Sequence, residues 1–433
     1  MMNQIGIIAD DLTGANDSGV QLAKKGLSST VVFDYRHAKA DAVSDVLVVD
    51  TDSRARSREE AYEAALGAAR FLKDRGSRHI YKKVDSTLRG NMAAELLAVE
   101  QVFQPDLVLI APAFPKMNRT TVNGHHYVGG VLITETEFAR DPKTPVQESY
   151  IPKLLQADAD RKVSLIDSDM LRLPESELRA RVTAELENGN TWFVCDSQSE
   201  EELVAIASFF AKLDKQILWT GSAGLIEYLP EALQLSPAGS GDEEVALTKK
   251  TLVVSGSLSQ TTRGQLQRVK EMEQAHFMEV SPEELIRQNG SSASYVEEML
   301  NHSDKDYYVL YVDASESNRV LGREVGAELG LSLNEVSEAI SSGLGQITKA
   351  LLKASGEIEG LILTGGDTAK AVCTELESGE MQLYSEVEPG LPFGRLHGES
   401  GSYWAITKAG GFGNDESLVD ALKYMTKQKK VRV

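Results

Sequence analysis

The sequence predicts an α/β protein of two domains, each a largely parallel sheet flanked by helices, with the active site in the cleft between them. Short apolar runs alternate along the chain with stretches whose apolar residues recur at helical spacing. The 433 residues are enough for two full cores. The clearest break in composition is SPAGSGDEEVALTKK at Ser236–Lys250. We therefore predict domains at residues 1–238 and 251–433, joined by a linker at residues 239–250.

Composition narrows the class of protein. The hydrophobic content of 42% and the charged content of 25% are typical of a globular protein. A net charge of −20 argues against nucleic acid and anionic membranes as partners. No run of residues resembles a signal peptide or a membrane span, and Cys195 and Cys373 have no zinc-like spacing. We expect a cytoplasmic protein; its oligomeric state is not readable, and a homodimer is compatible with the sequence.

The first predicted strand, Ile5–Ala9, is followed directly by Asp10 and Asp11 and then by a helix that ends near Gly26. Adjacent aspartates at a strand end can accept hydrogen bonds from substrate hydroxyls, hold a divalent cation or act as a general base. Alternatively, one caps the helix and the other is solvated. The motif GxGxxG is absent here, which weighs against a dinucleotide site.

Two arginines follow the next pair of predicted strands, Ser29–Phe33 and Val46–Asp50. Arg54 and Arg56 lie in the segment TDSRARS, before a helix at Glu59–Lys73. A loop arginine is more often solvated than functional. The carboxyl ends of parallel strands share one edge, however, so an arginine here could clamp a substrate carboxylate.

The segment YKKVDSTLRGN at Tyr81–Asn91 is the predicted centre of the substrate site. It turns from a strand end into a helix at Met92–Phe103, where α/β folds place ligands. Its polar residues could instead cap that helix, although a cap does not need the cations. Successive strand residues face opposite sides, so at most one of the two lysines should face a pocket. The candidate contacts suit a small polyhydroxylated anion, and they are Lys82, Lys83, Val84, Asp85, Ser86 and Arg89.

The rest of the first domain continues the alternation. The strand Leu107–Ala111 leads into a long polar segment, Pro112–Val128, which we expect to be a functional loop. Its adjacent His125 and His126 favour hydrogen bonding over metal binding. The remaining predicted elements are strands at Lys162–Ile166, Trp192–Cys195 and Ile217–Trp219, helices at Glu175–Glu187 and Glu200–Leu213, and a small-residue turn at Thr220–Leu225.

Three turns of small residues mark the second domain. They follow predicted strands at Thr251–Val254, at the start of LILTGGDTA and at Tyr403–Lys408; further elements are a strand at Tyr307–Asp313 and a helix at Leu333–Lys353. Backbone amides in such turns, at helix starts, suit the phosphates of a nucleotide. Plain tight turns are the alternative, and no Walker A motif is present. The candidate nucleotide contacts are Ser257, Thr364, Gly365, Gly366, Asp367, Gly410 and Gly411.

A polyol-acid site in one domain and a nucleotide site in the other predict phosphoryl transfer, which needs positioning, Mg²⁺ and a base. We expect Arg54 and the Lys82–Lys83 pair to hold the substrate carboxylate. Asp10, Asp11 and Asp85 are candidate bases. Asp11 is favoured, because the cations around Asp85 should lower its proton affinity, whereas Asp11 has an acidic neighbour and no base nearby in sequence. The sequence identifies no metal ligands.

The chain also resembles the four-carbon acid sugar kinases. The resemblance runs from residue 5 to residue 413 through IADDLTGA, YKKVDSTLRGN, APAFPKMNRTTVNGHHYV, TGSAGL, VSGSLS, LTGGDTA and ITKAGGFG. It implies a substrate domain, then a nucleotide domain, and transfer from ATP to the terminal hydroxyl of a tetronate. By motif it assigns substrate roles to Asp11, Arg54 and 82–85, and nucleotide roles to Ser257, 364–367 and Gly410 or Gly411. Within this resemblance, the residues of the segment KKVDSTLRGN favour D-threonate or D-erythronate as the substrate.

Other functions stay open. A 3-oxo-tetronate kinase or a kinase of a longer aldonate is the near alternative, and a sensor that binds sugar acid and nucleotide without turnover is another. Retention of Asp10, Asp11 and the TGGD segment argues against the sensor. A dehydrogenase lacks its fingerprint. The configuration of the substrate cannot be read from the sequence.

Overall fold

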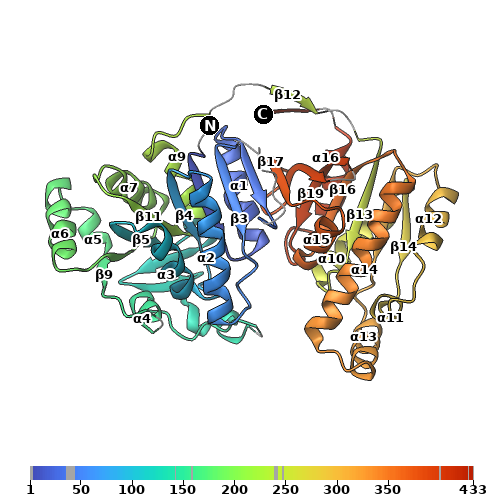
Figure 1. The fold of residues 1–433 in the computed structure, drawn as a ribbon, viewed down its shortest axis with the longest axis horizontal. Helices are drawn as coiled ribbons and strands as arrows, with labels where there is room; N and C mark the ends of the chain where they lie inside the picture. The colour runs from blue at the N-terminus through green and yellow to red at the C-terminus, as the bar shows by residue number, and fades with distance from the viewer. Residues whose placement is uncertain are drawn as a thin grey trace. The chain divides into compact units, whose positions relative to one another are not determined.

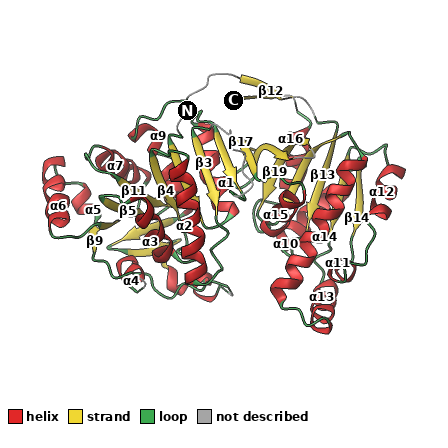
Figure 2. Cartoon of the chain, in the orientation of Figure 1, coloured by secondary structure: helices red, strands yellow, loops and turns green. Residues whose placement is uncertain are grey.

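The computed structural model describes residues 3–35, 44–141, 143–157, 159–237, 242–245, 248–398, 401–427 and 429–432. The chain forms two compact units, of which the first contains Met1–Tyr35 and Asp41–Gly239 and the second contains Ser240–Val433 (Figure 1). In both, strands form the inner layer and helices cover them (Figure 2). The α/β prediction is therefore confirmed.

The first unit contains an eight-stranded sheet in which every neighbouring pair is parallel. The sequences IGIIA and LVLIA are apolar throughout, and VLVVD is apolar up to its last residue, Asp50, as expected of strands covered on both faces. The strands in sheet order are β2 (Ser29–Val32), β3 (Val46–Asp50), β1 (Ile5–Ala9), β4 (His79–Lys83), β11 (Ile217–Gly221), β5 (Leu107–Ala111), β10 (Trp192–Cys195) and β9 (Val163–Ile166).

The helices of this unit pack on both faces of its sheet. Helix α2 packs against α3, whereas α1 packs against α8. Helix α2 begins with a capping box in which Ser57 and Glu60 satisfy each other's backbone amides. The helices are α1 (Leu12–Lys24), α2 (Arg58–Asp74), α3 (Met92–Phe103), α4 (Ile151–Gln156), α5 (Ser168–Leu171), α6 (Glu175–Glu187), α7 (Glu200–Ala211), α8 (Ala223–Ile226) and α9 (Leu229–Ala232).

The prediction of a loop at Pro112–Val128 is wrong. After a short 3-10 turn, this segment forms a hairpin of β6 (Arg119–Val122) and β7 (His125–Val128), and β8 (Val131–Leu132) pairs with β7. The two-residue turn is Asn123–Gly124, and both residues have positive φ (50° and 75°). Asn-Gly favours this type of hairpin turn, so the signal was present in the sequence.

The second unit has a seven-stranded sheet whose first five strands are parallel, whereas β18 runs antiparallel to both β19 and β17. The sequence did not predict these two antiparallel pairings. In sheet order the strands are β14 (Ala275–Glu279), β15 (Tyr307–Tyr311), β13 (Lys250–Ser255), β16 (Ile358–Thr364), β19 (Gly401–Lys408), β18 (Pro392–Gly398) and β17 (Glu380–Glu386).

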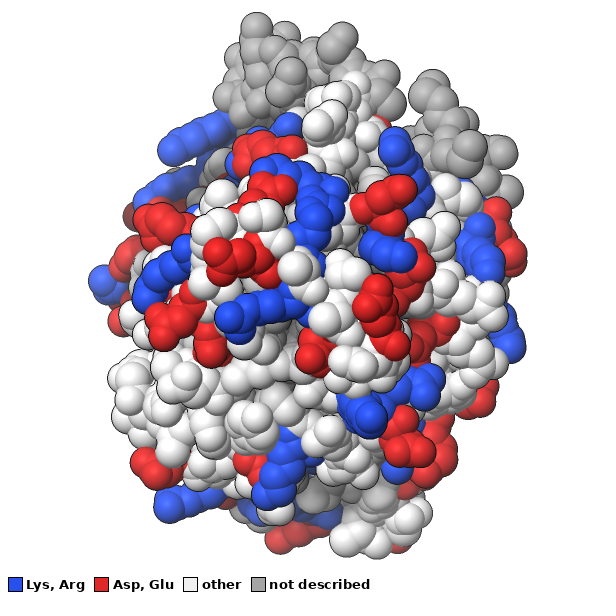
Figure 3. Space-filling view, turned by 90° about the vertical axis from the view of Figure 1, so that its left-hand side faces the viewer, with Lys and Arg blue, Asp and Glu red and all other residues white. Residues whose placement is uncertain are grey.

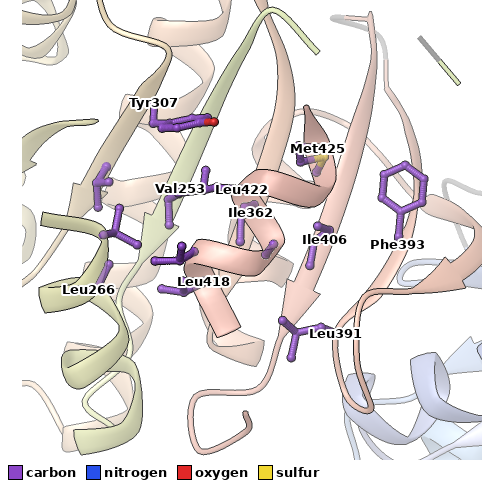
Figure 4. Close-up of a cluster of buried hydrophobic side chains, with 14 of the residues drawn as sticks. Val253, Leu266, Tyr307, Ile362, Leu391, Phe393, Ile406, Leu418, Leu422 and Met425 are labelled. Atoms are coloured by element: carbon purple, nitrogen blue, oxygen red, sulfur yellow. The ribbon is translucent and has the colours of Figure 1, made fainter. Parts of the chain in front are cut away.

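The helices of the second unit also divide between two faces, since α10 packs against α16 and α14 against α15. Figure 4 shows one apolar cluster, in which Leu418 and Leu422 of α16 lie over Val253, Ile362 and Ile406 of three adjacent strands. The helices are α10 (Gln260–Lys270), α11 (Pro282–Ile286), α12 (Ser292–Asn301), α13 (Glu316–Glu328), α14 (Leu333–Ala354), α15 (Gly366–Glu375) and α16 (Ser417–Met425).

The predicted linker lies partly outside the described residues, which omit 238–241 and 246–247. Within it, β12 (Asp242–Val245) pairs with β20 (Lys429–Arg432) in an antiparallel ribbon, which the sequence did not predict. The domain boundaries stay a prediction.

Charge is spread over the protein surface. Figure 3 shows a face on which Lys and Arg side chains are interspersed with Asp and Glu side chains, so the net charge of −20 is not gathered there in one acidic patch. Across the described residues, no helix has the length and apolar character needed to cross a bilayer.

Candidate functional site

The first cluster of polar side chains lies at the carboxyl edge of the first unit's sheet. Strand β1 pairs with β3 on one side and with β4 on the other, and Ala9 lies opposite both Asp50 and Lys83. The segments after the three strands therefore start at the same level. The helix after β1 packs on one face and the helices after β3 and β4 pack on the other, which is a topological switch point where α/β folds bind ligands.

Arg54 is held by both aspartates that follow β1. Its Nε and Nη2 donate to Asp10 at 2.8 and 2.9 Å, and its Nη1 and Nη2 donate to Asp11 at 2.6 and 2.7 Å. Only 17% of the Arg54 side chain is exposed. The guanidinium thus already has four charge-assisted hydrogen bonds, and its role within the protein is to hold two carboxylates in place.

The two aspartates differ in access to solvent. The Asp10 side chain is 3% exposed and that of Asp11 is 26% exposed, so Asp11 is the carboxylate that a ligand can reach. Asp11 also caps α1, because its Oδ1 accepts from the Gly14 amide at 2.8 Å. The alternative reading, one cap and one solvated aspartate, is therefore half right: Asp11 is the cap, and Asp10 is buried.

Their pKa values are shifted in opposite directions. Burial raises the pKa of Asp11 above its usual value; Arg54 opposes this rise and the charge of Asp10 adds to it. Burial would also raise the pKa of Asp10, but Arg54, Lys82 and Lys83 outweigh it and lower that pKa. No basic residue lies close to Asp11 in the sequence, but the fold brings Arg54 next to it. Asp11 nevertheless has a higher proton affinity than Asp10.

The lysines of β4 point to opposite faces, as their spacing predicts. Lys82 is fully buried, and its Nζ lies 3.0 Å from Glu95 Oε2 of α3. Lys83 Nζ donates to the carbonyl of Val84 at 3.0 Å, beside Gly14 of α1. The ammonium group of Lys82 therefore has a buried partner, and its position does not favour contact with a substrate.

The turn from Val84 to Gly90 is built around Asp85, which accepts hydrogen bonds from Arg89 Nε at 2.6 Å and Thr87 Oγ1 at 2.5 Å. Burial works against its charge, but Arg54 and Arg89 lower its pKa well below the usual range. The ordering cations are these arginines, not the two lysines. The capping alternative is not observed, since Asn91 precedes α3 without a side-chain cap.

Gly90 allows this turn to lie against the aspartate pair. Its φ is +96°, and a Cβ at this position would lie 3.1 Å from Asp10 Oδ2 and 3.5 Å from Arg54 Cγ. The residue before the arginine, Leu88, is also in the left-handed region, with φ of 57°.

The β6–β7 hairpin supports the same turn. His126 Nε2 lies 2.8 Å from the Ser86 carbonyl, its Nδ1 lies 3.2 Å from Thr121 Oγ1, and burial lowers its pKa to about 4. It is therefore neutral near pH 7 and orients Ser86. His125 instead contacts Ser149 at 3.0 Å. No cluster of three potential metal ligands occurs among the described residues.

Arg119, the first residue of β6, is a cation near the turn whose Nε is buried and has no hydrogen-bond partner. Burial lowers its pKa, Asp85 opposes this and Arg89 adds to it. Arg89 itself is engaged by Asp85 and, at 3.2 Å, by Asp141. The Nε of Arg119 therefore has hydrogen-bonding capacity that no group of the described residues uses.

The small-residue turns of the second unit also meet at one carboxyl edge, because β13, β16 and β19 are adjacent and parallel. Gly365 has φ of +100°, and a Cβ there would lie 3.7 Å from the Cβ of Ser257. A Cβ on Gly410 would lie 2.3 Å from Ser257 Oγ. The helices that follow β13 and β16 pack on different faces, so this too is a switch point.

The predicted nucleotide residues differ in exposure. Gly366, Asp367 and Gly411 are exposed, whereas Thr364 is buried and lies 3.3 Å from Thr262 Oγ1. A Cβ on Gly366 or on Gly411 would meet nothing within 4 Å. The exposed residues can meet a ligand, and Thr364 has a structural position.

Lys408 fixes the last of these turns. Its Nζ donates to the carbonyls of Ala409, Gly410 and Phe412 at 3.0–3.1 Å and to Thr262 Oγ1 at 3.3 Å. Burial lowers its pKa to about 8. One buried ammonium group thus holds the carbonyls inward, which leaves the other side of the turn for a ligand.

Comparison with known proteins decides the family. A model described as a sugar-binding N-terminal domain matches residues 5–229, and one described as a nucleotide-binding C-terminal domain matches residues 252–418. A D-threonate kinase of Salmonella typhimurium is 34% identical over 97% of each chain. The chain belongs to the four-carbon acid sugar kinase family. The prediction of a sugar-acid kinase is thereby confirmed at the level of the family.

Two further relatives agree with this assignment. A D-erythronate kinase of Heliobacterium modesticaldum is 33% identical over 98% of this chain and 97% of its own. The crystal structure of a Haemophilus influenzae protein, described only as DUF1537, covers 97% of this chain and 100% of its own with a TM-score of 0.79 and 26% identity. In this four-carbon acid sugar kinase, the sheet edge that carries Asp10, Asp11 and Arg54 lies in the stretch matched as sugar-binding. The small-residue turns at Ser257, Gly365–Gly366 and Gly410–Gly411 lie in the stretch matched as nucleotide-binding.

The sequence reasoning missed three residues that support these two edges, namely Glu95, Lys408 and Arg119. Glu95 stands in the apolar stripe of α3, and a carboxylate in such a stripe was the signal for its buried pairing with Lys82. Lys408 is likewise a charged residue in an otherwise uncharged, buried stretch, here at the end of β19. Arg119 carried no local signal, because the charged groups that act on it most lie about 30 residues away in the chain. The hydrogen bonding predicted for His126 is observed.

Proposed function

We propose that this protein is an ATP-dependent kinase that phosphorylates the terminal 4-hydroxyl of a four-carbon sugar acid, D-threonate or D-erythronate. The observation that carries the proposal is Asp11: a partly exposed carboxylate with a raised pKa, fixed by Arg54 at a switch point. The names of the relatives at 33–34% identity support these two acids over a 3-oxo-tetronate or a longer aldonate.

Asp11 is proposed as the general base. The substrate hydroxyl gives its proton to Asp11 as its oxygen attacks the γ-phosphorus, and the bond from that phosphorus to the bridging oxygen breaks to release ADP. Arg54 keeps the carboxylate oriented throughout. Asp85, whose pKa is lowered, stays ionised and orders Arg89.

For the substrate carboxylate we propose Arg119 as a partner beside the predicted Arg54 and Lys83. The four hydrogen bonds of Arg54 to the aspartates leave it little capacity to bind a further anion. Arg119 Nε has no hydrogen-bond partner among the described residues, so it can bind an anion without breaking an existing bond. Ser86 and Asp11 would accept hydrogen bonds from the hydroxyls of the acid.

The nucleotide is proposed to lie on the turns at Ser257, Gly365–Gly366 and Gly410–Gly411, whose amides suit phosphate. Mg²⁺ commonly binds through phosphate oxygens with one or two carboxylates. The exposed Asp367, next to Gly366, fits that requirement, and the ion would neutralise charge on the phosphates.

Both cysteines are buried and unpaired, which supports the proposal of a reducing, cytoplasmic location.

A coupled assay of ADP release tests this function across the stereoisomers of tetronate, 3-oxo-tetronate and longer aldonates, with and without Mg²⁺. We expect D-threonate or D-erythronate to give the highest kcat/KM, with turnover that depends on Mg²⁺. Turnover confined to longer acids, or none with any acid, would contradict the proposal.

Gly366→Val is expected to weaken ATP binding by about tenfold or more while leaving sugar-acid affinity nearly unchanged. The side chain would stand in open space where the phosphates are proposed to lie, so the fold should tolerate it. Gly356→Val is the matched control, because a Cβ there is equally unhindered and the residue precedes β16 at its other end. Calorimetry with each ligand alone measures both effects. Loss of sugar-acid binding with intact ATP binding would reverse the assignment.

Arg119→Met is expected to raise the KM for the sugar acid about tenfold or more, the effect of one lost charge-assisted hydrogen bond. The KM for ATP should change little. Arg161→Met provides the control, since Arg161 forms a surface pair with Glu100 at 3.1 Å. An unchanged KM for the acid in Arg119→Met would remove Arg119 from the site.

A further inference from the structure

The second unit contains a cavity that the proposed phosphate turns do not use. It has a volume of about 230 Å³ and lies between the carboxyl-terminal half of α10 and the carboxyl ends of β14 and β15. Ser257, Leu266, Phe277, Glu279, Tyr311 and Asp313 are among its lining residues.

Ser257 connects this cavity to the phosphate turns. It lines the cavity, and its side chain also lies against Gly410 and Gly365 at the two other turns. A ligand whose phosphates lie on the turns can therefore extend past Ser257 into the cavity without leaving the sheet edge.

The walls provide aromatic surface and hydrogen-bond acceptors. The rings of Phe277 and Tyr311 are 5.6 Å apart in an edge-to-face arrangement, and both are partly exposed. Tyr311 Oη donates to Glu279 Oε2 at 3.1 Å. Aromatic and apolar surface suits a planar base.

Asp313 lies two residues past the end of β15, the strand next to β13. The nearest cation, Arg263, has its Nε 3.9 Å from Asp313 Oδ1, beyond hydrogen-bond distance. In nucleotide-binding α/β sheets, an acidic residue at the end of the strand beside the phosphate-binding strand accepts hydrogen bonds from the ribose hydroxyls. Asp313 has this position and free acceptor capacity.

We propose that this cavity holds the nucleoside part of ATP, with the base against Phe277 and Tyr311 and the ribose hydroxyls on Asp313. The inference rests on the proposed function and adds to it the subsite and its ribose contact. Arg263 and Lys270 also line the cavity, so its walls contain two cations beside the two carboxylates.

The test is a thermodynamic cycle by calorimetry with Mg²⁺ and three probes: ATP, 2′,3′-dideoxy-ATP and tripolyphosphate. In the unmodified protein, removing the hydroxyls should weaken binding about tenfold, as for hydrogen bonds to a charged acceptor. Asp313→Asn should weaken ATP by a similar factor but leave dideoxy-ATP and tripolyphosphate unchanged. Asp304→Asn is the matched control, because Asp304 is exposed and precedes β15 at its other end.

A second variant keeps the test independent of Asp313. Gln267 is exposed on α10 and lines the cavity, so Gln267→Trp should obstruct the cavity and weaken ATP but not tripolyphosphate. ATP binding that is unchanged in both variants, or lost equally with tripolyphosphate, would overturn this inference alone. If the unmodified protein binds neither ATP nor tripolyphosphate, the proposed function and the inference both fail.

Discussion

Asp11→Asn is expected to lower kcat about 100-fold or more with little change in ATP affinity, the effect usual for loss of a general base. The amide keeps the shape of the carboxylate and can still cap α1, so the fold should persist. Because burial raises the pKa of Asp11, activity of the unmodified enzyme should fall as the pH drops toward that pKa and Asp11 becomes protonated. The variant should lose this acidic limb.

Asp85→Asn is the informative comparison. Asp85 orders Arg89 and has a lowered pKa, so its replacement should affect the KM for the acid more than kcat. Steady-state kinetics of both variants over a range of pH separates the roles. Near-normal turnover in Asp11→Asn with a large loss in Asp85→Asn would exchange the two assignments.

Arg54→Met is expected to reduce the free energy of unfolding by about 3–5 kcal/mol, the cost of leaving a buried carboxylate without its partner. Asp10 would lose both of its arginine contacts. The KM for the sugar acid should also rise about tenfold or more, with a smaller effect on ATP, because Asp11 is no longer held in place.

The loss of stability should depend on pH in a definite direction. The lowered pKa of Asp10 contributes stability above its unfolded pKa, and this contribution disappears as the pH falls through the folded value. Without Arg54, burial raises that pKa, so the variant is penalised at neutral pH and relieved in acid. Denaturant unfolding should therefore show the difference from the unmodified protein shrinking toward low pH.

Arg56→Met is the control for this experiment. Arg56 is 43% exposed and pairs with Asp52 at 3.3 Å, so its removal should cost at most about 1 kcal/mol. Equal losses in both variants would contradict a structural role for the Arg54 cluster.

The parallel core was predictable because its strands are continuous apolar runs and its ligand edges follow from strand order. Asp10, Asp11 and Arg54 could be brought to one edge from this rule alone. Their mutual bonding could not, because it depends on how the turn after β3 folds back: the amides of Ser53 and Arg54 both donate to the Asp10 carbonyl. That contact gave Arg54 two aspartates as partners.

The remaining misses have identifiable causes. The β6–β7 hairpin was predicted as a loop since polar composition outweighed its Asn123–Gly124 turn signal. Strands β17 and β18 contain alternating polar residues and a register irregularity, so they lack the apolar runs of the parallel core. The Lys82–Glu95 pair joins a strand to a helix, a contact that sequence spacing does not encode.

The central claim is that the sheet edge of the first unit binds the sugar acid and that of the second unit binds the nucleotide. Hydrogen–deuterium exchange with each ligand alone tests it most directly. D-threonate or D-erythronate alone should protect the amides of residues 84–91. Mg²⁺-ATP alone should protect those of residues 255–259, 365–368 and 409–413, without protecting the first set. Protection of 84–91 by ATP alone, with the three turns protected by the acid alone, would contradict the account.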